Sequence, residues 1–182
     1  MKVAAFALAA ALPLTVTAGG FSLRSSDLDA ARPIPEKHVF KGFGCEGGNV
    51  SPALEWKGAP QGTKSFALTV YDPDAPTGSG WWHWLVINIP ATTTQLEAGA
   101  GDAAAGKLPA GALQTRTDFG STGWGGPCPP KGDKPHHYIF TIHALKTDKI
   151  DLPADAPAAM VGYMINANRL AKASFTAHYG RK

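Results

Sequence analysis

The 182-residue sequence has few of the features that mark specialised classes of protein. It contains two cysteines, and neither has a second Cys or a His at zinc-ligand spacing, so neither a zinc ribbon nor a disulfide-dense scaffold is indicated. Lys and Arg number 17 against 14 Asp and Glu, and no run of five basic residues occurs, which disfavours a nucleic-acid partner. Internal repeats and the HExxH and GxSxG motifs are also absent, so no familiar hydrolase or metalloenzyme class is indicated.

The longest apolar run lies at the N-terminus, over residues 3–16, and it is shorter than the roughly 20 residues that span a bilayer. Lys2 precedes the run, and small residues that a signal peptidase accepts end at Ala18. We therefore predict a cleaved signal peptide, residues 1–18, followed by one domain, residues 19–182. The predicted localisation is periplasmic or secreted, without stable insertion in a membrane.

Export would place the two cysteines in an oxidising compartment. Cys45 and Cys128 have only one intramolecular pairing there, and we predict a disulfide between them. Two separate buried thiols that behave as small apolar side chains are the alternative.

Gly (21) and Pro (15) are abundant and lie between short apolar runs, which is typical of many turns joining many strands. The alternation of side chains expected of strands is clear in four segments and weaker in three. The four are 64–72, 83–89, 136–145 and 174–179, and the three are 37–43, 53–56 and 112–118. Seven short strands predict a mainly β protein, built as an antiparallel sandwich or barrel.

One segment, 155–171, has a helical period instead, with Asp155 as the expected N-cap. We expect its methionines, Met160 and Met164, to pack against the sheets rather than to line a lipid or cofactor site. Residues 91–111 are rich in Ala, Gly and Thr and are predicted to form a surface loop.

Two proline-rich segments place ionisable side chains at the ends of predicted strands. Residues 71–76 (YDPDAP) follow one strand, and residues 126–132 (GPCPPKG) precede another. Proline fixes φ and removes a backbone donor, so both loops are stiff and suited to a preformed pocket.

The strings DPDAP (72–76), WWH (81–83) and GPCPPKG, followed by HHY (136–138), resemble the phosphatidylethanolamine-binding protein family, also called Raf kinase inhibitor protein-like. The resemblance is greatest to the exported bacterial YbhB/YbcL branch and runs from about residue 21 to the C-terminus. It implies a β-sandwich of two antiparallel sheets, with one helix near the C-terminus and short peripheral helices, around a small anion pocket. The matching pocket positions are Asp72, Pro76, Trp81, His83, Pro129, Pro130, His136 and Tyr138.

Two positions depart from the family pattern. Cys128 stands where many relatives have Gly or Ala, which is consistent with a link to Cys45. Trp82 stands where animal members carry His, and we expect it to make the rim of the pocket more apolar.

The chemistry of the pocket residues fits an anion. His136 and Tyr138 are two apart on one predicted strand and share a face, whereas His137 points away. His83 and His136 can donate N–H, and Tyr138 can donate O–H, to a phosphate or carboxylate oxygen, while Asp72 can fix a histidine tautomer or pair with the cationic part of a ligand. We expect phosphate or phosphoethanolamine to bind more tightly as pH falls through about 6.5, because the two pocket histidines gain protons there. The ligand's own second protonation at about pH 6 removes negative charge, so a modest gain or a maximum near that pH is expected.

The turn from Asp72 to Pro76 predicts a cis Ala75-Pro76 bond, because the turn must bring both ends to one pocket wall.

The leading hypothesis is a non-catalytic binding module without metal or cofactor. One alternative is an inhibitor of an extracytoplasmic or host protein, a protease or a signalling partner, that acts through a rim of Trp81, Trp82 and Pro130. A second alternative is an unrecognised hydrolase that uses Asp72 and a histidine. Each of these residues, considered alone, is explained by an ordinary structural role. The pocket hypothesis therefore depends on their occurring together, in the order of the family's motifs.

Overall fold

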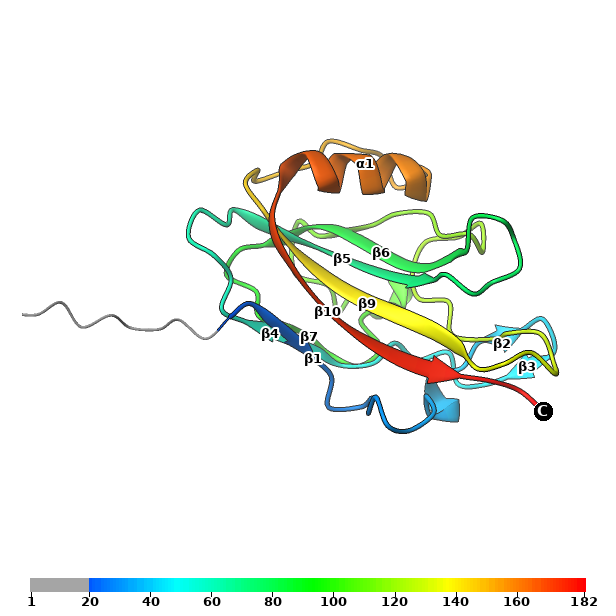
Figure 1. Ribbon diagram of the computed structural model, residues 1–182. Helices are drawn as coiled ribbons and strands as arrows, with labels where there is room; N and C mark the ends of the chain where they lie inside the picture. The colour runs from blue at the N-terminus through cyan, green and yellow to red at the C-terminus, as the bar shows by residue number, and fades with distance from the viewer. Residues whose placement is uncertain (1–19) are drawn as a thin grey trace, which may run out of the picture.

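The computed structural model describes residues 20–182, so the predicted signal peptide lies outside the described residues (Figure 1). Strand β5 has seven buried residues out of eight, which places it at the centre of the larger sheet. Each neighbouring pair in this sheet is antiparallel. The strands lie in the order β10 (Arg169–Tyr179), β9 (His136–Leu145), β5 (Ser65–Asp72), β6 (Trp81–Pro90) and β8 (Leu113–Gln114).

A smaller antiparallel sheet covers one face of the larger one. Its strands are β1 (Ser22–Arg24), β4 (Leu54–Lys57) and β7 (Gln95–Leu96). The two sheets share one apolar core, in which the rings of Trp56 and Phe66 lie 5.6 Å apart. The predicted mainly β sandwich is confirmed.

The helix α1 (Ala158–Asn168) packs on the opposite face of the larger sheet (Figure 1). Its buried side chains Val161 and Ile165 belong to a second apolar cluster with Leu85 of β6. Met164 also packs there, but Met160 is 50% exposed, so the expectation that both methionines pack against the sheet is wrong for Met160.

The helix is shorter than its sequence period predicted at both ends. Pro157 is its N-cap, in extended conformation, and Arg169 is extended and already belongs to β10. Residues 169–171, which the apolar period predicts to be helical, instead belong to β10, which pairs with β9.

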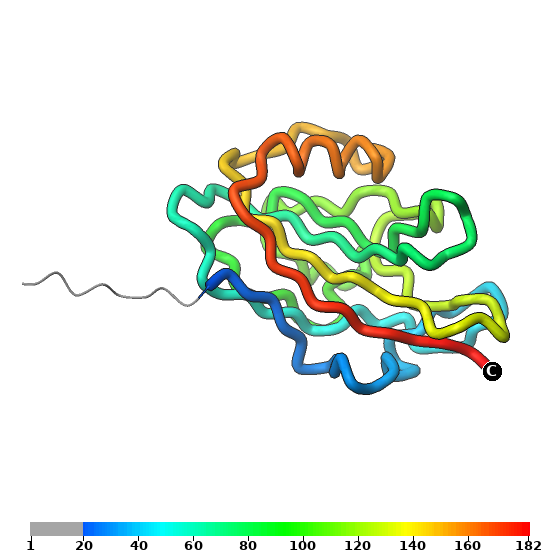
Figure 2. The backbone as a smooth tube through the Cα atoms, viewed as in Figure 1, coloured from blue at the N-terminus to red at the C-terminus, as the bar shows by residue number. Residues whose placement is uncertain are grey.

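The shorter elements differ most from prediction. The expected strand 37–43 is a 3-10 helix, η1 (Glu36–His38), followed by β2 (Lys41–Gly42), which pairs with β3 (Cys45–Glu46). Residues 91–111 form the expected loop, but they also contain β7 and a 3-10 turn, η2 (Ala103–Ala105). Figure 2 shows the β5–β6 loop, the β2–β3 hairpin and the segment that leads into β9 at one end of the sheets, near the C-terminus.

Candidate functional site

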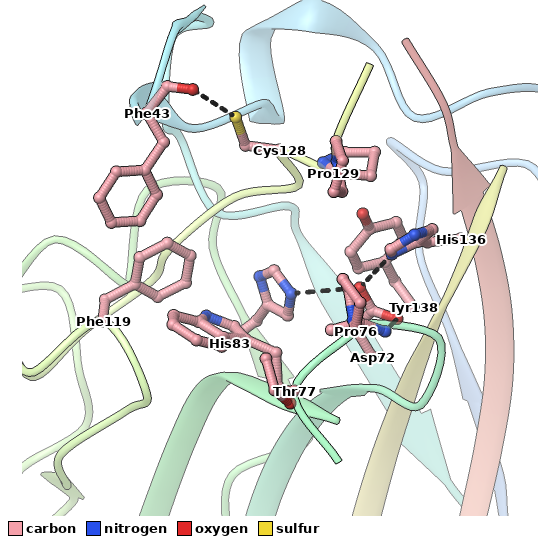
Figure 3. Close-up of a pocket in the computed structure, with 13 residues that line it drawn as sticks. Phe43, Asp72, Pro76, Thr77, His83, Phe119, Cys128, Pro129, His136 and Tyr138 are labelled. Atoms are coloured by element: carbon pink, nitrogen blue, oxygen red, sulfur yellow. Dashed lines mark hydrogen bonds and ion pairs between the residues drawn. The ribbon is translucent and has the colours of Figure 1, made fainter. Parts of the chain in front are cut away.

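A cavity of about 180 Å³ lies where β5 ends and where β6 and β9 begin (Figure 3). Thirteen residues line it, and all eight of the predicted ligand-binding residues are among them. The lining is Phe43, Asp72, Ala75, Pro76, Thr77, Trp81, His83, Phe119, Cys128, Pro129, Pro130, His136 and Tyr138.

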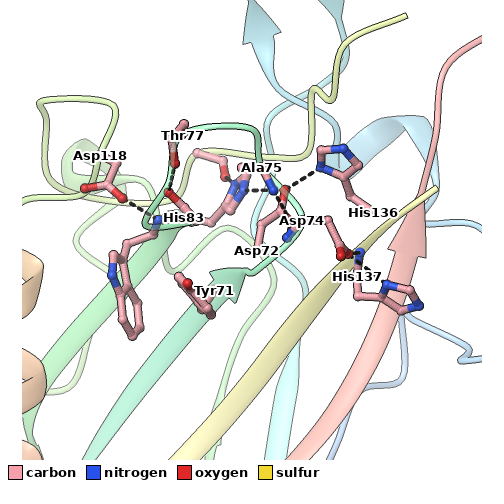
Figure 4. A network of polar contacts seen from close by, with 12 residues as sticks. Tyr71, Asp72, Asp74, Ala75, Thr77, His83, Asp118, His136 and His137 are labelled. Atoms are coloured by element: carbon pink, nitrogen blue, oxygen red, sulfur yellow. Dashed lines mark hydrogen bonds and ion pairs between the residues drawn. The ribbon is translucent and has the colours of Figure 1, made fainter. Parts of the chain in front are cut away.

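Asp72 organises the loop at the base of the cavity. Its side chain is almost fully buried, and Oδ1 accepts hydrogen bonds from the backbone N–H groups of Asp74 (2.8 Å) and Ala75 (3.2 Å) (Figure 4). Asp-Pro segments favour such turns because the carboxylate replaces a backbone acceptor. The backbone N–H of Thr77 then donates to the carbonyl of Ala75 over 2.8 Å, which closes the loop.

The expectation of a cis Ala75-Pro76 bond is wrong, since the described residues contain no cis peptide bond. Pro76 nevertheless lines the cavity. The turn that Asp72 stabilises through its side chain brings Pro76 to the wall while the peptide bond stays trans.

His136 lies between two carboxylates. Its Nδ1 atom is 2.8 Å from Oδ2 of Asp72, and its Nε2 atom is 3.3 Å from Oδ2 of Asp133. Both ring nitrogens can donate at once only when the ring carries two protons. His136 can therefore supply positive charge to the site.

His83 is buried and differs from His136 in its bonding. Its Nδ1–H donates to the carbonyl oxygen of Gly125 over 2.6 Å, and its Nε2 atom lies 4.0 Å from Oδ2 of Asp72. Burial lowers the pKa of His83 well below its ordinary value, against the opposing effects of the Gly125 carbonyl and the Asp72 carboxylate. The expectation that His83 gains a proton near pH 6.5 and faces the anion as a cation is therefore wrong.

Tyr138 brings an unpaired hydroxyl to the cavity. The side chain is fully buried, and its O–H has no hydrogen-bond partner among the described residues. Burial raises the pKa of Tyr138, so the hydroxyl stays protonated and is available as a donor. His137, between His136 and Tyr138, is exposed and points away from the cavity, as the strand period predicted. It pairs with Asp74 at 2.8 Å.

The rim of the cavity is aromatic and tied by a disulfide. Cys45 and Cys128 are bonded, with their Cα atoms 6.0 Å apart, so the predicted disulfide joins the β2–β3 hairpin to the proline-rich loop. The rings of Phe43 and Phe119 stack with centroids 5.9 Å apart (Figure 3). Trp81 meets the Phe119 ring edge to face at 5.4 Å.

Sequence reasoning missed Phe43 and Phe119. Phe43 lies in Gly-Phe-Gly and has a φ of +52°, a turn signal that the strand prediction for 37–43 overlooked. No local pattern marks Phe119. The expectation that Trp82 lies on the rim of the pocket is wrong. It lies outside the cavity because neighbours on a strand point to opposite faces, and its ring is 4.5 Å from that of Tyr71.

Two further findings concern the part of the chain that the structure describes. Within residues 20–182, no cluster of three or more His, Cys, Asp or Glu side chains is arranged to hold a metal ion. No helix in that range is both long and apolar enough to cross a membrane.

Comparison with known proteins gives consistent matches. The family model described as phosphatidylethanolamine-binding protein matches residues 24–180. UPF0098 protein YbcL of Escherichia coli is 56% identical over 168 residues, which cover 92% of each chain. UPF0098 protein YbhB of Escherichia coli is 53% identical, over 86% of this chain and 98% of that protein. The crystal structure of YbcL, described as a new member of the mammalian PEBP family, superposes with a TM-score of 0.88 over 90% of this chain and 100% of that chain, at 58% identity.

Proposed function

This chain belongs to the phosphatidylethanolamine-binding protein family, and from that premise we propose that its pocket binds small anions, in particular phosphorylated head groups such as phosphoethanolamine, without catalysing a reaction. The eight pocket residues predicted from the sequence are the proposed ligand contacts. The proposed setting is the periplasm or the exterior of the cell.

The observation that carries this proposal is Tyr138, a cavity-lining residue whose buried O–H has no partner among the described residues. A buried donor without an acceptor costs about 1 to 3 kcal/mol, so a ligand oxygen at this point would be stabilising. His136 can add a second donor when a ligand oxygen replaces Asp133, 3.3 Å away, as the partner of its Nε2–H. Pro76, Pro129 and Pro130 hold the walls in place, so binding orders little additional chain.

The lining also supports a binding role rather than a hydrolytic one. The only cysteine in the lining, Cys128, is in a disulfide and has no free thiol. The hydroxyl of Thr77 donates to the carbonyl of Gly80. Neither side chain is hydrogen-bonded to a base that would activate it as a nucleophile.

The proposal is tested by native mass spectrometry of protein exported to the periplasm, followed by calorimetric titration with phosphoethanolamine. We expect one phosphorylated small molecule per chain and saturable binding. Folded protein that binds neither phosphoethanolamine nor inorganic phosphate at any pH between about 5 and about 8 would overturn the proposal.

A second candidate function is inhibition of an extracytoplasmic protein through the rim. The observation in its favour is Phe43, which is 70% exposed and has a positive φ, an unusual conformation for a large side chain. Exposed aromatic residues of this kind are common anchors in protein interfaces. An inhibitory activity that Phe43→Ser abolishes, while phosphoethanolamine binding is unchanged, would support this function over the first.

A further inference from the structure

Two hydrogen-bond acceptors face each other inside the cavity. The Nδ1–H of His83 is donated to the carbonyl of Gly125, so Nε2 of the neutral ring carries a lone pair and no proton. This atom lies 4.0 Å from Oδ2 of Asp72, which is beyond hydrogen-bond distance (Figure 3). The gap between the two atoms can be bridged only by a group that brings its own hydrogen.

Asp72 cannot provide that hydrogen in its observed bonding. Its carboxylate accepts from three N–H groups, those of His136, Asp74 and Ala75. Hydrogen bonds from N–H groups to a carboxylate are charge-assisted and strong, so these three bonds hold the side chain in an accepting arrangement. The Asp72 side chain is thus an acceptor toward His136, toward the loop and toward the cavity.

Positive charge near this pair is scarce. Among the described residues, no Lys or Arg lines the cavity. Besides His83 and Asp72, the titratable groups around the pair are Asp74, Asp118, Asp133, His136, Tyr138, Tyr179 and Arg181. Arg181 directs its Nε–H to the carbonyl of Pro129 and one Nη–H to that of Gly44, whereas the His136 ring is bonded directly to Asp72. A fully ionised phosphate dianion would face a buried carboxylate with little compensating charge.

From this arrangement we propose that the pocket selects phosphate monoesters in their singly protonated form. The P–OH group donates into the gap between Asp72 and His83, and an ionised phosphate oxygen accepts from Tyr138. This inference rests on the proposed function, because it specifies the ester class and protonation state of the anion bound at the same site. A phosphate diester, such as the head group of an intact phospholipid, has no P–OH near neutral pH and would set an oxygen against two acceptors.

The proposal predicts a steep pH dependence that originates in the ligand. A phosphate monoester loses its second proton near pH 6, so the singly protonated fraction falls about tenfold for each pH unit above that value. The apparent affinity should fall by the same factor, and each binding event above pH 7 should take up about one proton. Proton uptake by the protein alone would act on every anion alike, so a comparison of anions separates the two sources.

The experiment is calorimetric titration of the wild-type protein near pH 7.5 in two buffers of different ionisation enthalpy, which counts the protons taken up. The ligands are phosphoethanolamine, the diester glycerophosphoethanolamine, and inorganic sulfate. We expect phosphoethanolamine to bind with uptake of about one proton, and the other two to bind at least about tenfold more weakly. Equal binding of the monoester and the diester without proton uptake would overturn this inference and leave the proposed function intact. If none of the ligands binds at any pH, the proposed function fails as well.

The variant Asp72→Asn tests the same point from the protein side. It replaces one acceptor oxygen with an amide that can donate, so the preference for phosphoethanolamine over sulfate should shrink to a few-fold. The exposed variant His137→Ala should keep the full preference. An Asp72→Asn protein that melts cooperatively and discriminates as the wild type does would contradict the proposal, and the wild-type proton count decides the question if this variant does not fold.

Discussion

His136, the first residue of β9, donates from Nδ1 to Oδ2 of Asp72, the last residue of β5, over 2.8 Å. The two strands are antiparallel neighbours in a register that sets Tyr71 opposite Ile139, so the pairing itself brings the two ends together. Both side chains are buried. The bond therefore connects the proline-rich loop after β5 to the sheet and orients both groups toward the cavity.

We expect His136→Ala to weaken binding of phosphoethanolamine by about 1.5 to 3 kcal/mol, the range for a hydrogen bond to a charged group. His137→Ala is the matched control, because His137 is exposed on the opposite face and contacts Asp74 rather than the cavity. Calorimetric titration of both variants measures the difference, and thermal melting checks that each remains folded. Equal affinities for the two variants would remove His136 from the site.

Much of the site could be predicted because its residues lie at strand ends in recognisable strings. The period of two separates His136 from His137 correctly, since β9 is a regular strand from its first residue. The same rule applied to residues 81–83 places Trp82 on one face of its strand and Trp81 and His83 on the other, as the structure shows. The error for Trp82 came from matching it to a position where animal family members carry His, instead of using its position on the strand.

The remaining parts depend on contacts between residues far apart in the sequence. Phe119 reaches the cavity through its packing against Phe40 and Phe43 of another segment, with ring centroids 4.5 and 5.9 Å away. The neutral state of His83 depends on its burial, and the position of its one proton depends on the carbonyl of Gly125, 42 residues away along the chain. Neither relationship leaves a local sequence pattern.

The Cys45–Cys128 disulfide should contribute substantially to stability. It closes a loop with a sequence separation of 83, for which the chain-entropy estimate is about 4.5 kcal/mol. Urea unfolding with and without reductant should therefore show a large loss of unfolding free energy in the wild type. The unfolding free energy of the double variant Cys45→Ser/Cys128→Ser should not change when reductant is added. Alkylation that finds two free thiols in exported protein would contradict this prediction.

Two glycines in the β5–β6 loop should differ sharply on substitution by alanine. Both have positive φ, +75° at Gly78 and +70° at Gly80. An added Cβ at Gly78 meets nothing within 4 Å, so Gly78→Ala should cost about 1 to 2 kcal/mol of backbone strain alone. At Gly80 the added carbon would also clash with the Tyr71 ring and the Asp72 carbonyl, so Gly80→Ala should cost about 1 to 3 kcal/mol more. Equal unfolding free energies for the two variants would show that the loop relaxes freely.

The last prediction concerns stability in acid, which should fall because buried histidines are neutral in the folded state. Burial lowers the pKa of His143 to about 3, and the nearby cations of Arg169 and Lys172 act in the same direction. Burial also lowers the pKa of His38 and His83. Below about pH 6.5 the unfolded chain takes up protons that the folded protein does not, so this stability is complete above pH 6.5 and is lost as pH falls. Between pH 7 and pH 5 the loss should be about 2 kcal/mol from His143 alone.

Urea unfolding at both pH values measures this loss. The unfolding free energy of His143→Gln should fall by less than that of the wild type, by that amount, while that of exposed His137→Gln should fall as much as that of the wild type. If His143→Gln has the same pH dependence as the wild type, His143 does not carry the acid sensitivity.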